Sequence, residues 1–359
     1  MALHVTPDEI RARTAPCRVF VCPDFFIDHL VRYPGAYSDL VKEFNRIMAQ
    51  GGGNVLGTEQ YIAKGGNAVN TAVALGRLGI RTTLFTKTSR VGLHLLKLFT
   101  ETLPIDLSLV DYRASPSITT ALEVHDDSGR LSNMMISDSG SLLSIGPEDI
   151  TEDVVASLRR SDLVCVFNWV QTKRGTEIAE KVFSTAKDSA RCLTFIDISD
   201  PSYRLGEIPS LVERLFKQGL VDVLSLNENE LERIAASLSM SPFEDGRGHS
   251  SRFLTQFAGQ LGCAVDYHTA DFSASASGRG ACQVPSFQVS PVRITGAGDT
   301  WNAGNIAGYL AKLEPADRLL LANAAAGFYI SNSEPVPPTL EDAFRFSATV
   351  PRKNITGSF

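Results

Sequence analysis

The run "LVCVFNWVQTKRGTEIAEKVFSTAKDSARCLTFIDI", residues 163–198, places two short apolar segments on either side of a helical pattern. The outer segments, residues 163–168 and 193–198, are rich in β-branched and aromatic residues, which is typical of buried strands. Between them, residues 175–190 carry apolar side chains at helical spacing. A strand, a helix and a second strand in this order predict a parallel strand pair covered by the helix.

The same alternation extends in both directions along the chain. Further buried strands are predicted at residues 18–23, 82–87 and 221–227, with helical patterns at 67–79 and 229–238. We therefore predict an α/β fold in which a doubly wound, mostly parallel sheet is flanked by helices on both faces. Ligands bind such sheets at the carboxyl ends of the strands.

Two segments depart from the alternation. Residues 117–138 carry β-forming residues around the turn "DDSGR" and predict a hairpin, which we interpret as a small β lid. An amphipathic helix at 37–48 precedes the glycine-rich "AQGGGN" at 49–54, which is either a mobile loop near the active face or a linker. We expect one domain over residues 1–359, with lid segments near 31–63 and 108–140.

Composition excludes several classes of protein. The 359 residues carry a net charge of −6, which argues against a nucleic-acid partner. The first residues lack the apolar core of a signal peptide, and the apolar runs are too short to cross a bilayer, so we expect a cytoplasmic protein without a membrane partner. The six cysteines are scattered without a CxxC pair, which favours free thiols.

Three motifs carry the candidate chemistry. In "TGAGDTWNAG", residues 295–304, three small residues precede an acid at the start of a helix. The amides of Gly296, Ala297 and Gly298 would cradle a phosphate, and Asp299 would accept a proton from a hydroxyl beside it. Such a cradle and base suit phosphoryl transfer. The alternative is an Asp that caps a helix after an ordinary glycine turn.

The second motif is "KGGNAVNTAVALGRLG", residues 64–79, which is neither GxGxxG nor a P-loop. Asn67 and Asn70 would face one side of the helix start, where their amides suit the hydroxyls of a polyol. Helix capping and close packing by small residues explain the motif equally well.

The third motif, "SLNENELERI", pairs Asn227 with Glu230 where a strand enters a helix. Their oxygens are suited to Mg²⁺, mainly through water, because this ion keeps much of its hydration shell. The alternative is a reciprocal helix cap.

In this order, the motifs resemble the ribokinase-like (PfkB) family of carbohydrate and nucleoside kinases. The resemblance runs from about Arg18 to Ala343 and is strongest in "KGGNAVNTAVALGRLG" and "TGAGDTWNAG". It implies ATP and Mg²⁺ as cofactors, a lid at 117–138 and a homodimer through that lid. The implied substrate-binding residues are Asp28, Gly65, Gly66, Asn67, Asn70 and Asn168; the implied nucleotide-binding residues are Asn227, Glu230, Thr269 and Asn323. Asp299 is the implied general base.

Two departures from the family pattern bear on cofactors. The family commonly has D-T-x-G-A-G-D, and its first Asp helps to bind a monovalent cation, whereas this chain has Arg293 and Ile294. We therefore predict activity that does not need potassium, since Arg293 supplies a fixed positive charge. The usual T-x-G turn at the nucleotide is replaced by Asp271 and Phe272, which leaves the phosphate donor open.

The sequence thus predicts a kinase that transfers the γ-phosphate of MgATP to a hydroxyl of a sugar or sugar-like polyol. A nucleoside acceptor stays open because six aromatic residues lie near the predicted pocket or lid: Phe25, Phe26, Tyr33, Tyr37, Tyr61 and Trp169. A non-catalytic sugar or nucleotide sensor is the other alternative, against which the retained "GAGD" argues.

Overall fold

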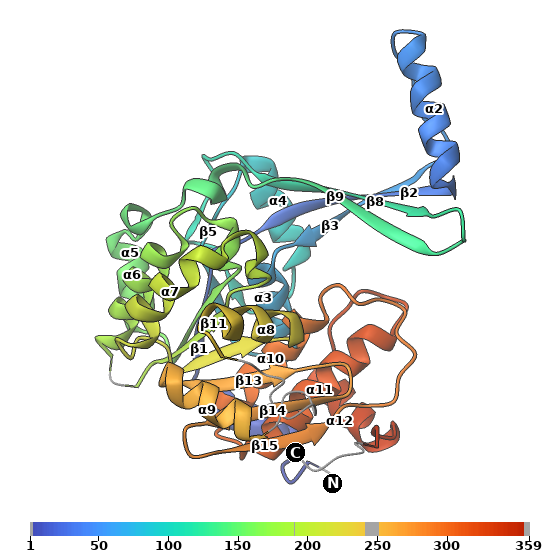
Figure 1. Cartoon of the computed structure of the whole chain (residues 1–359). Coiled ribbons are helices and arrows are strands. Elements are labelled where there is room, and N and C mark those ends of the chain that lie inside the picture. The colour runs from blue at the N-terminus through green and yellow to red at the C-terminus, as the bar shows by residue number, and fades with distance from the viewer. Residues whose placement is uncertain (1–2, 190, 241–250, 355–359) are drawn as a thin grey trace.

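A large sheet forms the centre of the molecule in the computed structural model, which describes residues 3–189, 191–240 and 251–354 (Figure 1). Within these ranges the strands of this sheet are β1 (Arg18–Cys22), β4 (Arg81–Leu84), β6 (Ile105–Asp106), β10 (Leu163–Phe167), β11 (Leu193–Asp197), β12 (Val223–Leu226), β13 (Ala264–His268), β14 (Phe272–Ser277) and β15 (Gly280–Pro285). Their spatial order is β15-β14-β13-β12-β11-β10-β1-β4-β6. Only the pairs that β14 forms with β13 and β15 are antiparallel, so the predicted mostly parallel sheet is confirmed.

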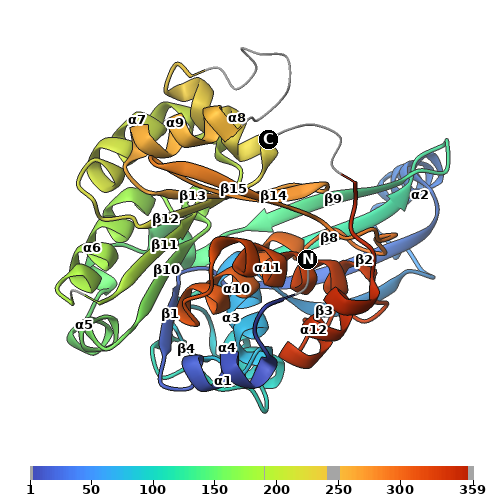
Figure 2. The ribbon, with the colours of Figure 1, turned by 90° about the horizontal axis from the view of Figure 1, so that it is seen from below.

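Helices cover both faces of this sheet (Figure 2). On one face lie α1 (Pro7–Thr14), α3 (Asn67–Arg77), α4 (Arg90–Phe99), α10 (Ala297–Leu310), α11 (Pro315–Ser331) and α12 (Leu340–Thr349). On the other lie α5 (Glu152–Arg159), α6 (Gly175–Lys187), α7 (Ile208–Leu211), α8 (Glu228–Ser237) and α9 (Ser251–Leu261). In these ranges no helix combines the length and the apolar character that crossing a membrane requires.

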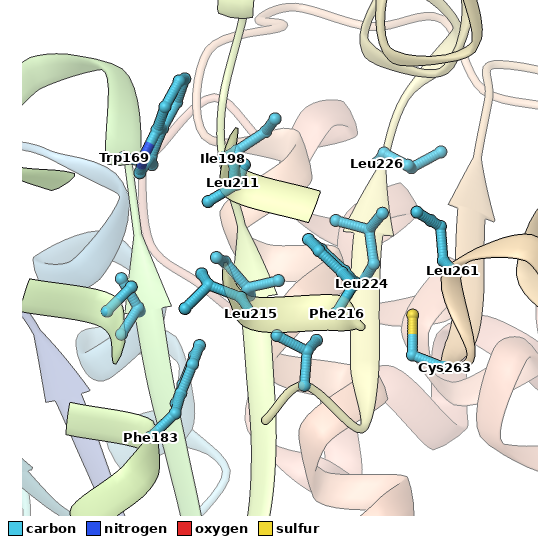
Figure 3. Packing of buried hydrophobic residues seen from close by; sticks show 14 of the residues in the cluster. Trp169, Phe183, Ile198, Leu211, Leu215, Phe216, Leu224, Leu226, Leu261 and Cys263 are labelled. Atoms are coloured by element: carbon cyan, nitrogen blue, oxygen red, sulfur yellow. The ribbon is translucent and has the colours of Figure 1, made fainter. Parts of the chain in front are cut away.

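Alternation of side chains along the strands divides the core into two layers. In β10, Val164 and Val166 pack with the α6 side, whereas Leu163, Cys165 and Phe167 pack with the α3 side. Figure 3 shows part of the first layer, where side chains such as Phe183 and Leu215 fill the space between helices and strands. A sheet buried on both faces explains why its strands read as continuous apolar runs in the sequence.

A second sheet of four strands extends from the body (Figure 1). Its strands are β2 (Phe26–Ala36), β3 (Glu59–Gly65), β8 (Ser117–His125) and β9 (Leu131–Asp138). The predicted hairpin is therefore present as β8 and β9, and it pairs with β2 through parallel bonds to β8. The amphipathic α2 (Tyr37–Ala49) stands at the far end of this small sheet, away from the body. We call these four strands the lid sheet.

Most predicted elements in the body occur with shifts of one or two residues at their ends. The strand predicted at 82–87 is interrupted at Phe85: β4 stays in the main sheet, and β5 (Thr86–Lys87) pairs with β7 (Val110–Asp111) instead. The helix predicted at 175–190 ends at Lys187, and the last residue of that range, Ala190, lies outside the described residues.

Candidate functional site

Two cavities meet above the carboxyl ends of the parallel strands. The first has a volume of about 330 Å³ and lies between the main sheet and the lid sheet. The second has a volume of about 480 Å³ and lies between the start of α10 and the loop that follows β13. Asn227, His268 and Gly298 line both cavities, so the two spaces join there.

The predicted site residues divide between the two cavities. The first cavity is lined by Asp28, Gly66, Asn67, Asn70, Asn168, Asn227, Glu230, Gly296, Gly298 and Asp299; the second by Asn227, Thr269, Ala297, Gly298 and Asn323. Gly65 lines neither, but a Cβ there would lie 2.2 Å from Oδ1 of Asp28. Glycine at position 65 therefore lets the Asp28 carboxylate lie against the end of β3.

Asp299 lies in the first turn of α10, with 8% of its surface exposed. Its Oδ2 accepts a hydrogen bond from Nδ2 of Asn70 at 2.9 Å, which links α10 to α3. Burial raises the pKa of Asp299 to about 8, and the neighbouring carboxylates of Asp197 and Asp24 raise it too. The Asn70 hydrogen bond and the charge of Lys64 oppose this rise. Such a carboxyl group can change its protonation state near neutral pH, as a general base must.

The start of α10 presents amides to the joint of the two cavities. Gly296 precedes the helix with φ 83°, and a Cβ there would lie 2.8 Å from the hydroxyl of Tyr329, so a glycine is required. The Ala297 amide donates to a carbonyl of the preceding turn. The amides of Gly298 and Asp299 have no acceptor within the described part of the chain. The free donors at the predicted cradle are therefore these two amides.

Gly298 differs from Gly296 because no packing contact requires it. A Cβ at Gly298 would come no closer than 3.5 Å to the nearest atom, Cε1 of His268, which is an ordinary contact distance. A side chain there would instead occupy the joint of the cavities. The open space in front of the two free amides is the feature that fits an anion such as a phosphate.

Asp24 fills the space in front of the first amides of α3, which is the space left open at the start of α10. The sequence did not identify this residue as part of the site. Its carboxylate accepts the amides of Asn67 and Ala68, each at 2.8 Å, and Nδ2 of Asn168, also at 2.8 Å. Gly66, with φ 96°, offers no side chain to cap this helix, so Asp24 caps it from outside. Its position just after β1 follows the same strand-end rule that identified Asn168.

Asn227 and Glu230 form a reciprocal cap at the start of α8. Asn227 Oδ1 accepts the Glu230 amide at 3.1 Å, and Glu230 Oε2 accepts the Asn227 amide at 3.0 Å. Burial raises the pKa of Glu230 to about 8, and the carboxylate of Asp197 adds to this effect. Asp197, at the end of β11, also lines the first cavity and was not among the predicted residues.

The arrangement of Asn227 and Glu230 fits a cation that is bound through water molecules. No cluster of three or more His, Cys, Asp or Glu side chains suited to a metal occurs in the residues that the structure describes. Carboxylates that raise one another's pKa would be stabilised by a nearby cation. Since the oxygens of Asn227 and Glu230 already hold the helix cap, these residues fit contact through water rather than a direct shell of ligands.

In the second cavity, the predicted nucleotide residues are bonded within the protein. Asn323 accepts Nε1 of Trp301 at 2.8 Å, and Oγ1 of Thr269 donates to the carbonyl of Phe272 at 3.0 Å. Phe272 begins β14, so the turn between β13 and β14 is short. Apolar walls dominate the rest of the cavity, with Phe287, Val289, Ile294, Ala326 and Ile330.

Arg293 lines the second cavity but directs its guanidinium to the end of α11. It donates to the carbonyls of Asn332 at 2.6 Å and Glu334 at 2.7 Å, and also to those of Tyr329 and Ser333. The predicted fixed positive charge is therefore present, three residues before the cradle. It neutralises a group of backbone carbonyls rather than facing the first cavity.

Four of the six aromatic residues expected near the pocket or lid lie in the lid sheet or at the start of α2: Phe26, Tyr33, Tyr61 and Tyr37. Trp169 is a core residue: it is 1% exposed, its Nε1 donates to Thr176, and Arg204 stacks on its ring. Phe25 is also buried in the core, whereas Phe26 lines the first cavity. The indole of Trp169 is therefore not a stacking surface for a ligand.

Comparisons with known proteins agree with this architecture. A match to the pfkB family carbohydrate kinase profile covers residues 39–342. No curated protein matches the chain in sequence. Among solved structures, ribokinase of Arabidopsis thaliana complexed with ribose and ATP has a TM-score of 0.71 and 18% identity, over 92% of this chain and 98% of that one.

Two further solved structures also align with 92% of this chain, over 98% of their own chains. Adenosine kinase of Sinorhizobium meliloti has 21% identity and a TM-score of 0.66. Ribokinase of Cryptococcus neoformans in complex with ADP has 16% identity and a TM-score of 0.68. These identities show a shared fold. With the profile match over most of its length, the chain belongs to the pfkB family of carbohydrate kinases and is an ATP-dependent phosphotransferase.

Proposed function

We propose that this kinase transfers the γ-phosphate of MgATP to a hydroxyl of a sugar or sugar-like polyol in the first cavity. Asp299 takes the hydroxyl proton, the hydroxyl oxygen forms a bond to the γ-phosphorus, and the bond to the β-phosphate oxygen breaks to release ADP. The amides of Gly298 and Asp299 stabilise the negative charge on the transferred group.

The position of Asp299 in the first cavity, directly after Gly298 at the joint, is the observation that carries this proposal. Its Oδ2 is held by Asn70, and the residue lines the space where Asp28, Asn67 and Asn168 gather. The two free amides of α10, those of Gly298 and of Asp299 itself, belong to the same helical turn. An acceptor in the first cavity and a nucleotide in the second would thus meet at one base and one cradle.

The second cavity would receive the nucleotide. Its volume and apolar walls suit an adenine, and its shared wall with the first cavity would direct the phosphates toward Gly298. Asn227 and Glu230 would hold Mg²⁺ through water, and this ion would neutralise phosphate charge when bound. Thr269 and Asn323 would contribute mainly backbone and wall contacts, since their polar side-chain atoms already have partners.

A polyol fits the first cavity better than a nucleoside does. Carboxylates, amides and hydroxyls dominate its lining, and Phe26 and Met135 are its large apolar side chains. A volume of about 330 Å³ is near the lower end for ligand sites. A nucleoside would need broader apolar faces for its base, so we place it second.

We also propose that the lid sheet forms a homodimer. Asp28, Thr119 and Ser137 share one row of the sheet and line the cavity, so the neighbouring rows point outward. The outward face carries exposed apolar side chains at Ile62, Ile118, Met134 and Ile136. An apolar face of this kind on a protruding sheet suits a second copy of the same sheet.

The test is ADP release from MgATP with a panel of sugars, sugar alcohols, inositols and nucleosides, measured for the wild type and two variants. Asp299→Asn keeps the shape and removes the base, so kcat should fall by roughly 10² or more. Asp28→Asn, on the other side of the cavity, should mainly raise KM for the acceptor. An Asp299→Asn variant with wild-type kcat would contradict the assignment of the base, and turnover with nucleosides alone would contradict the polyol.

A further inference from the structure

Lys64 lies behind the cavity rather than in its wall. It is paired with Ile27 in the lid sheet, one row away from the pair of Asp28 and Ala63, so its side chain points to the opposite face from Asp28. Asp28, Asn70 and Asp299 line the first cavity, whereas Lys64 does not. In the described residues, neither Lys nor Arg lines this cavity, although five carboxylates lie in or next to it: Asp24, Asp28, Asp197, Glu230 and Asp299.

A short chain of hydrogen bonds joins Lys64 to Asp299. Lys64 Nζ donates to Oδ1 of Asn70 at 2.8 Å, and Asn70 Nδ2 donates to Oδ2 of Asp299 at 2.9 Å. An ammonium group is only a donor and an ionised carboxylate is only an acceptor. The amide of Asn70 therefore has a single orientation that satisfies both neighbours, and Lys64 fixes it. Oδ2 of Asp299 is occupied, which leaves Oδ1 to accept a proton from a substrate.

We propose that Lys64 is a positioning residue for the general base: through Asn70 it selects the reactive oxygen of Asp299, and its charge favours the ionised carboxylate. The inference rests on the proposed function, in which Asp299 takes the hydroxyl proton. It also explains why a lysine stands directly before the two glycines of "KGGN", a position from which its side chain cannot reach a substrate in the cavity.

The charges around Asp299 show why such a residue matters. The groups that face it are Asn70 on α3, Lys64 on β3, Asp197 on β11, Asp24 after β1 and Tyr329 on α11. Burial and the two carboxylates raise its pKa, and Lys64 is the cation that opposes them. Burial in turn lowers the pKa of Lys64 to about 8, with Asp299 and Asp28 acting against that shift. Both groups therefore titrate in the range where the enzyme would work.

The experiment compares the pH dependence of kcat between pH 6 and 9.5 for the wild type, Lys64→Met and Lys64→Arg. Loss of an opposite charge within about 4–6 Å shifts a carboxyl pKa by one unit or more. In Lys64→Met, the acid limb of the kcat profile should therefore move up by about one pH unit. Its kcat should be about tenfold lower at pH 7 and approach the wild-type value at pH 9. Lys64→Arg keeps the charge and should keep the limb near its wild-type position.

The controls separate this role from a structural one. Lys87→Met removes another partly buried lysine, which pairs with Asp149 away from the cavity, and should leave the profile unchanged. The double variant Lys64→Met/Asn70→Ala should have a kcat only slightly below that of Lys64→Met alone, because both changes break the same chain of hydrogen bonds. If Lys64→Met does not fold, Lys64→Arg and Asn70→Ala still test the chain: a wild-type acid limb in Asn70→Ala would overturn the proposal.

The outcomes also distinguish this inference from the proposed function. An unchanged acid limb in Lys64→Met, or a rise in acceptor KM without any change in kcat, would show that Lys64 only neutralises Asp28. If Asp299→Asn lowers kcat while Lys64→Met leaves the limb in place, the base stands and the role of Lys64 fails. If Asp299→Asn keeps wild-type kcat, the proposed base itself fails.

Discussion

Replacing Gly298 by alanine should separate the stability of the protein from its activity. Gly298 lies in the first turn of α10 without the positive φ that Gly296 has, and an added Cβ would meet only Cε1 of His268, at 3.5 Å. Nothing in the packing opposes a methyl group. Because alanine favours a helix over glycine, the free energy of unfolding should rise by at most about 1 kcal/mol.

The activity should change in the opposite direction. The methyl group would stand in the joint of the cavities, in front of the free amides of Gly298 and Asp299. Loss of one such donor in other enzymes lowers kcat by about 10²–10³, or about 2.7–4 kcal/mol in the barrier. We therefore expect kcat/KM for MgATP to fall by about 10²–10³, while calorimetry shows unchanged binding of the acceptor.

Thermal unfolding and ADP release measure the two effects on the same sample. Gly296→Ala is the matched control, because its φ of 83° and the Tyr329 hydroxyl at 2.8 Å should destabilise the fold by about 1–2 kcal/mol or more. A Gly298→Ala variant with wild-type kcat would refute the route of the phosphate through this joint. A loss of Tm as large as that of Gly296→Ala would refute the packing argument.

Two other predictions concern the surroundings of the site. Because the Arg293 guanidinium already binds four backbone carbonyls, turnover of the wild type should be equal in K⁺ and Na⁺ at the same ionic strength; strong activation by K⁺ would contradict this role. For the dimer, sedimentation velocity should show a dimeric wild type and a monomeric Ile136→Lys variant, with Leu98→Lys on the exposed side of α4 as a control that stays dimeric. A monomeric wild type would rule out the lid dimer.

The central strands could be predicted because each lies between two apolar layers. Strands β10 and β11 have side chains buried on both faces, and such runs are distinct in the sequence. Strand β14, "FSASAS", which lies between β13 and β15, was not predicted, since small residues have little β propensity of their own. It is fixed by distant contacts, such as the bond from Arg318 to Ser275, which no local pattern reveals. Similarly, β5 leaves the main sheet because its partner is β7.

The sequence predicted which residues lie at the candidate site better than it predicted what each of them does there. Strand ends and helix starts identified Asn168, Asn227 and Asp299, and all three line one cavity. The sequence does not tell whether an acid after a strand faces a ligand or caps a helix. Asp24 and Asp28 illustrate this difficulty: they are four residues apart, yet Asp24 caps α3 while Asp28 lines the cavity from β2. The role of Lys64 depends on the register of β2 and β3, which the sequence leaves open.

The cap that Asp24 places on α3 has a consequence for how a ligand is oriented. Two helices, α3 and α10, start with glycine turns at the same cavity, and either start would attract an anion. Asp24 satisfies the amides of α3 with a carboxylate that is part of the chain itself. A phosphate at α3 would therefore have to displace the Asp24 carboxyl group from the amides of Asn67 and Ala68, whereas no side chain caps the start of α10. This asymmetry would favour α10 over α3 as the end of the cavity at which the phosphates of a nucleotide bind, and so would orient the two substrates relative to each other.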